Sequence, residues 1–103
     1  MSYAIAKANN NKVIIFGGDY GNYPNFSQLD DLWEFDAYDT STWTEINITS
    51  SKPSERGSHK MSSVNNNMII LFGGGNNYID GDYINRFNDT WEYDIDSNTW
   101  SEN

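Results

Sequence analysis

The chain carries the same pattern twice, and this internal repeat constrains its fold more than any other feature. Each copy contains an apolar run ending in two glycines, then an aromatic segment, then a second tryptophan: 13–18 and 69–74, 32–36 and 90–94, Trp43 and Trp100. The offset between the copies is 56 residues at the glycines, 58 at the first tryptophan and 57 at the second. Repetition at this period indicates stacked modules, because a module that cannot bury its own faces needs neighbours.

Each copy is predicted to form four short strands, since the apolar residues alternate or run continuously and show no helical period. The predicted strands of the first copy are 3–8, 13–16, 31–36 and 42–48, with turns at 9–11 and 39–41. Those of the second copy are 58–64, 68–72, 89–94 and 99 onward, with turns at 65–67 and 96–98. The segments 19–30 and 75–88 are predicted to be long polar loops.

These features resemble the kelch repeat, the four-stranded blade of a β-propeller. The resemblance rests on the apolar strand ending in Gly-Gly, on the aromatic segments 33–36 and 91–94, on the two trailing tryptophans, and on the lead-in 53–56. It covers essentially the whole chain and implies an all-β fold of two four-stranded antiparallel kelch blades, part of a β-propeller. We expect blades at residues 1–48 and 58–103, joined by a linker at residues 49–57.

Two blades leave hydrophobic surface uncovered. A blade has apolar side chains on both faces, and in a propeller each face packs on a neighbouring blade. Two blades share one interface and expose two outer faces, which soluble monomers rarely tolerate. We therefore expect either a piece of a longer propeller or a homo-oligomer, in which three copies would give six blades and four would give eight.

Composition excludes several classes of function. The 103 residues carry a net charge of −9, and the 6 basic side chains are scattered, whereas nucleic-acid binding needs clustered lysine and arginine. The chain has no cysteine, which excludes disulfides, thiolate metal sites and a cysteine nucleophile. Its apolar runs are only strand-length, so we expect no association with a membrane. The acidic balance attracts basic partners, although acidic side chains also simply solvate loops.

The two predicted loops and the linker fall on one rim, because successive strands run in alternate directions. This rim is rich in tyrosine, asparagine and aspartate, which suits recognition of proteins or glycans, although turn formation favours the same polar residues. The candidate partner-binding residues are Tyr20, Tyr23, Phe26, Arg56, Tyr78, Asp80, Asp82, Tyr83 and Arg86.

Several single residues are open to a structural interpretation as well as a functional one. Arg56 also has a structural reading, as a bridge between the rim loops. His59 is the only histidine and is expected to be structural, because no activating residues accompany it. The triplet 80–82 offers oxygen ligands but lacks the spaced acidic set of a calcium loop, so we predict no metal site. The four tryptophans are expected to be packing residues, because they recur at equivalent positions.

The sequence therefore predicts a non-catalytic scaffold that binds a protein through this rim and needs no cofactor. Two alternatives remain. The Tyr/Asn-rich loops also fit a carbohydrate-binding or extracellular adhesive propeller. The chain also fits a structural portion of a larger propeller enzyme, although kelch-type copper oxidases need a cysteine and several histidines that it lacks.

Overall fold

The computed structural model describes residues 4–7, 12–37, 41–65 and 67–103, and this part of the chain is all-β. Ten strands are present in it and no helix. Their bounds are β1 Ala4–Lys7, β2 Lys12–Asn22, β3 Asn25–Asp36, β4 Thr42–Glu45, β5 Lys60–Asn65, β6 Met68–Phe72, β7 Gly75–Ile79, β8 Asp82–Arg86, β9 Thr90–Asp94 and β10 Thr99–Glu102. Within the described residues, nothing has the length and hydropathy of a membrane-crossing helix.

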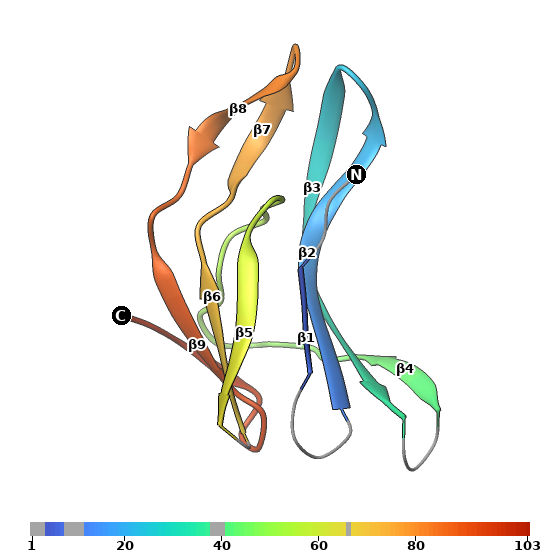
Figure 1. Ribbon diagram of the computed structural model, residues 1–103, viewed down its shortest axis with the longest axis vertical. Coiled ribbons are helices and arrows are strands. Elements are labelled where there is room, and N and C mark those ends of the chain that lie inside the picture. The colour runs from blue at the N-terminus through green and yellow to red at the C-terminus, as the bar shows by residue number, and fades with distance from the viewer. Residues whose placement is uncertain (1–3, 8–11, 38–40, 66) are drawn as a thin grey trace.

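The strands form two antiparallel sheets that face each other (Figure 1). The first sheet has the order β1-β2-β3-β7-β8, and β4 also pairs with β3. The second sheet has the order β10-β9-β6-β5. Each repeat thus contributes the four expected strands, and β7 and β8 of the second repeat join the sheet of the first. The fold is that of kelch blades of a β-propeller.

The prediction of a long polar loop at residues 19–30 was wrong. β2 continues to Asn22, and β3 begins at Asn25, so this region is a β-hairpin. The register shifts between Phe16 and Gly18, where Gly17 adopts a φ of 68°. A bulge with a left-handed glycine bends a strand without ending it, so the first glycine pair does not terminate β2. In the second repeat β6 does end at Phe72, directly before the glycine pair, as predicted.

The second predicted loop, residues 75–88, is also largely strand. β7 and β8 form a hairpin whose turn is made by Asp80 and Gly81, with φ values of 53° and 88°. Two successive positive φ angles are the signature of the type I′ turn that joins hairpin strands. An Asp-Gly pair is a preferred sequence for this turn, so the triplet 80–82 has a structural explanation.

The remaining predicted strands are present with shifted ends. β4 ends at Glu45 where Ile48 was expected. β1 spans Ala4–Lys7, and residues 3 and 8 of the predicted strand lie outside the described part of the chain. β5 begins two residues later than predicted, at Lys60. The turn predicted at 9–11, and parts of those at 39–41 and 65–67, lie outside the described residues.

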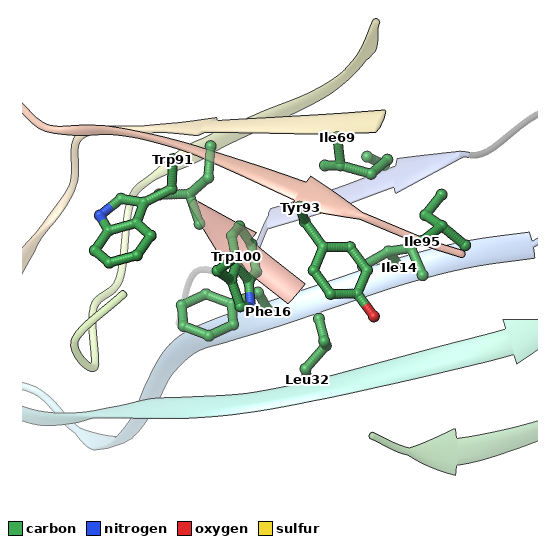
Figure 2. Packing of buried hydrophobic residues seen from close by; sticks show 10 residues of the cluster. Ile14, Phe16, Leu32, Ile69, Trp91, Tyr93, Ile95 and Trp100 are labelled. Carbon is green, nitrogen blue, oxygen red and sulfur yellow. The ribbon is translucent and has the colours of Figure 1, made fainter. Parts of the chain in front are cut away.

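The hydrophobic core lies between the two sheets. Ile14, Phe16 and Leu32 of the first sheet are fully buried against Trp91, Tyr93 and Trp100 of the second (Figure 2). The Trp100 ring meets Phe16 edge-on, with 5.3 Å between ring centroids, and lies 4.9 Å from Tyr93. Edge-to-face aromatic pairs of this kind add to the free energy gained by burying their area.

The segment between the repeats is held against the first sheet. The amide of Gly18 donates to the Arg56 carbonyl at 2.8 Å, and the amide of Arg56 donates to the Leu29 carbonyl at 3.2 Å. Gly57 and Gly75 exchange two backbone hydrogen bonds. Residues near 56 therefore wedge between the bases of the two hairpins, at the end of the molecule where the predicted rim lies.

Candidate functional site

The candidate site is the pair of hairpins that project beyond the core. We call these two hairpins, residues 19–30 and 75–86, the paired hairpins. They lie side by side at one end of the molecule (Figure 1) and are joined where Phe26 of β3 pairs with Tyr78 of β7. The rings of these two residues meet edge-on with centroids 5.0 Å apart. Backbone pairing and ring packing together fix the hairpins relative to one another.

A polar network connects the bases of the paired hairpins. The Tyr83 hydroxyl donates to Asp19 Oδ2 at 2.7 Å and lies 2.9 Å from Ser58 Oγ. Gln28 Nε2 donates to Asp19 Oδ1 at 2.9 Å, while Gln28 Oε1 accepts from the amide of Asn77 at 2.8 Å. Asp19 is buried and thus organises groups from both hairpins. Sequence reasoning missed Asp19 and Gln28, because their partners on the second hairpin, Tyr83 and Asn77, lie 64 and 49 residues away along the chain.

The tips of the hairpins are also tied together. The amide of Gly81 donates to the Pro24 carbonyl at 3.0 Å, and the amide of Asp80 donates to Asn25 Oδ1 at 3.1 Å. A side chain at Gly81 would come within 3.2 Å of the Tyr23 hydroxyl. The tips therefore form one continuous surface in which Tyr23, 73% exposed, is the most accessible aromatic residue.

Eight of the nine predicted site residues lie on the paired hairpins, and they are not equally accessible. Tyr20 and Tyr23 are largely exposed, and the side chains of Asp82 and Arg86 form an exposed ion pair on β8. Phe26 and Tyr83 both pack on the Tyr78 ring, and all three rings are only partly exposed. The exposed side chains also include Ile79 and Ile84, which are not among the predicted site residues.

Arg56 occupies a different environment from the other eight. Its side chain is only 1% exposed, and both of its terminal nitrogens contact the Asp89 carboxylate, at 2.7 and 2.9 Å. Nη1 also donates to the Gly73 carbonyl at 3.0 Å, and the guanidinium lies 4.2 Å from the Phe87 ring centroid. These contacts match the structural reading of Arg56 as a bridge, and a partner would reach it only if the pair opened.

The electrostatics beneath the hairpins follow from burial. The guanidinium of Arg56, by hydrogen bonding to Asp89, holds the pKa of that carboxyl below its usual value. Burial lowers the pKa of His59 from 6.5 to about 4, so the imidazole is neutral near pH 7. Its Nε2 lies 2.6 Å from the Phe16 carbonyl oxygen and therefore carries the proton of the neutral ring.

The described residues contain no candidate metal site. No group of three or more His, Cys, Asp or Glu side chains comes together among them as a metal site would require. The arrangement is a rigid, exposed surface of aromatic, aliphatic and acidic groups, which is suited to contact with another molecule.

Comparison with known proteins agrees with the fold. The sequence profile of the KLHDC2/KLHL20/DRC7 Kelch-repeats domain matches residues 1–103. The chain is also 26% identical over 92 residues to the dynein alpha chain of the flagellar outer arm of Chlamydomonas reinhardtii. That match covers 87% of this chain but spans only 2% of the relative's length. The repeated blade elements and the match along the full chain together show that this chain belongs to the kelch-repeat family.

Proposed function

We propose that this chain binds a protein partner through the surface of the paired hairpins. Kelch repeat domains commonly serve as protein-interaction scaffolds, and this proposal assigns that role to a particular surface. The observation that carries it is the accessible group at the hairpin tips, led by Tyr23 and held by hydrogen bonds from the amides of Gly81 and Asp80 to the opposite turn. A preorganised surface loses little conformational entropy when it binds.

The chemistry of this surface defines the kind of partner. Tyr20 and Tyr23 offer rigid aromatic contact area, and Asp80 and Asp82 add exposed acidic side chains to the same pair of hairpins. The net charge of −9 would attract a basic partner and speed its association. We therefore propose a basic segment of another protein as the ligand, without a catalytic step or a cofactor.

The proposed test is binding of the 103-residue chain to an immobilised array of basic peptides and, in parallel, to a glycan array. We expect peptide binding that weakens at least tenfold with Tyr23→Ala and weakens as salt concentration rises. Val64→Ala is the matched control, because Val64 is 60% exposed but lies on β5, outside the paired hairpins. Equal binding by Tyr23→Ala and the wild type would contradict the proposal.

A glycan ligand is the second candidate, because exposed tyrosines can also stack on sugar rings. It predicts binding on the glycan array that is lost with Tyr23→Ala but changes little with salt. Salt dependence therefore separates the two candidates, since only the peptide is held by charge.

We also propose that residues 1–48 and 58–103 act as two blades of a larger propeller, with residues 49–57 as the linker. The ring would be completed either by further blades of a longer chain or by assembly of three or four copies. The exposed outer faces of both sheets support this proposal.

A further inference from the structure

The outer face of the first sheet matches, residue by residue, the buried face of the second. Cross-strand pairing puts Ile15 beside Trp33, and Phe35 beside both Val13 and Trp43, on one face of the first sheet. In the second sheet the residues paired in the same way are Leu71 with Trp91, and Tyr93 with Ile69 and Trp100. This second set is buried against the first sheet. The first set is partly or largely exposed, and Trp43 is the most accessible member at 46%.

The outer face of the second sheet matches the buried face of the first sheet, which is the other half of the interface between the sheets. Between the two sheets, the face of the second sheet that carries Trp91 and Trp100 packs on Ile14 and Phe16 of the first. The residues that correspond to these two are Ile70 and Phe72, at the same 56-residue offset. Phe72 is 51% exposed and Ile70 is partly exposed. The two outer faces of the stacked sheets thus carry the two halves of an interface whose complete form lies between the sheets.

The paired hairpins repeat this relation at their edges. Within the chain, β3 of one hairpin pairs with β7 of the next. Among the strands that the structure describes, β8 is the last of that sheet, so its outer edge faces no further strand of this part of the chain. Ile84 on β8 corresponds to Phe26 at the 58-residue offset, and it is 65% exposed where Phe26 packs on Tyr78. Unpaired strand edges promote pairing with another chain.

We infer that the chain self-associates head to tail, with the Phe72 face of one copy seated on the Trp43 face of the next. The internal interface is the template for this contact, and a second copy of this chain is its occupant. The inference rests on the proposed role as part of a larger propeller and names the neighbour. Because the two faces differ, the contact is heterologous, and such contacts close into rings when the rotation permits.

The test uses two variants that each block one face. Trp43→Glu places a charge on the first sheet's outer face, and Phe72→Glu does so on the second sheet's. Native mass spectrometry should show assemblies of three or four 11.8 kDa chains for the wild type and single chains for each variant. An equimolar mixture of the two variants should form a one-to-one dimer, because each supplies the face that the other has lost. Only a head-to-tail interface gives this complementation.

Controls separate this inference from the partner-binding proposal. Tyr23→Ala should leave the assembly mass unchanged, because Tyr23 lies at the hairpin tips and on neither outer face. Circular dichroism should show the same strand content for both glutamate variants, and amides of β8 should exchange faster in their single chains than in the wild-type assembly. A wild-type chain that stays monomeric over a wide range of concentration would overturn the inference. So would a variant mixture that stays monomeric while the wild type assembles.

Discussion

The two repeats place equivalent aromatic residues in opposite environments. Trp43 and Trp100 occupy matching positions, and each follows a threonine in a short strand. Nevertheless 46% of the Trp43 surface is exposed, against 5% for Trp100. The cause is the neighbour, because Trp100 packs on Phe16 of the other sheet while the corresponding face of the first sheet lies open. A blade of this chain therefore owes the burial of its aromatic face to the blade beside it.

The largest expected effect comes from truncating each tryptophan in turn. Trp100→Ala should lower the free energy of unfolding by about 4 kcal/mol, because it removes buried ring area and leaves a cavity between the sheets. Trp43→Ala should cost less than about 1 kcal/mol in the isolated chain, since little of its ring area is lost from a core. Urea denaturation at low protein concentration measures both values.

The effect of Trp43→Ala on stability should depend on protein concentration. If a second copy covers Trp43, the wild type gains stability as its concentration rises, and the Trp43→Ala variant gains much less. The gap between the two unfolding midpoints should then widen with concentration. Equal destabilisation by Trp43→Ala and Trp100→Ala in a monomeric chain would show that position in the repeat, and not the neighbour, sets their contributions.

The next comparison is between two ion pairs that involve the segment joining the repeats. Arg56→Met should cost about 3 kcal/mol, because it leaves Asp89 and the Gly73 carbonyl without the buried guanidinium. Lys52→Met breaks the pair between Lys52 and Asp30, whose side chains are substantially exposed, and should cost less than about 1 kcal/mol. Thermal unfolding of both variants provides the measurement. Similar losses would mean that Arg56 does not tie the linker to the second repeat.

The pH dependence of stability separates the contribution of His59, at the linker end of the core, from that of the rest of the chain. His59 has a pKa of about 4 in the folded chain and 6.5 when unfolded, so the unfolded state binds more protons between these values. The stability that neutral His59 contributes is fully present above pH 6.5 and is lost as the pH falls towards 4. The expected loss from pH 7.5 to pH 5 is about 2 kcal/mol.

The variant His59→Gln isolates this contribution. Glutamine can still donate to the Phe16 carbonyl but does not titrate, so the slope of stability between pH 4 and 6.5 should flatten. The charged neighbours of His59 partly oppose one another, because Arg56 and Lys60 lower its pKa while Asp19 raises it. Asp89 contributes in a lower window, since its pKa lies below the ordinary value of 3.8. An unchanged slope in His59→Gln would assign the effect to the carboxylates instead.

The sequence predicts the blades well because their strands alternate within local segments. The faces of β2 and β9, for example, follow directly from the period of two. The paired hairpins were missed because part of their stability comes from pairing between repeats, as between Phe26 and Tyr78, which lie far apart in sequence. The Asp80-Gly81 turn was the one local signal available, since Asp-Gly between apolar segments favours a hairpin.

The environment of Arg56 could be read from the sequence only as two alternatives. Its neighbours are polar and resemble an exposed linker, while its partner Asp89 is 33 residues away. A buried ion pair leaves no periodic pattern. The accessible part of the candidate site, including Tyr23, was within reach of sequence reasoning, because aromatic residues among turn formers stand out. The exposed Ile84 was not, because an apolar residue in a predicted strand-free segment has no expected face.

The smallest expected effect concerns the first glycine of each Gly-Gly pair. Gly17 and Gly73 both have positive φ, at 68° and 75°, so alanine at either position pays a similar backbone cost of about 1 kcal/mol. Their surroundings differ. A Cβ at Gly17 would come within 2.9 Å of the Arg56 and Leu29 carbonyl oxygens, whereas at Gly73 the nearest atom is 3.5 Å away.

The difference arises because the linker crosses the first glycine pair, where the amide of Gly18 holds the Arg56 carbonyl. Gly17→Ala should therefore cost about 1 kcal/mol more than Gly73→Ala, as expected when a tightly packed site must shift to admit a methyl group. Urea denaturation of the two variants measures that difference directly. Equal costs would mean that the Arg56 carbonyl moves aside freely, and the linker would then be a loose connection between the blades and not part of their packing.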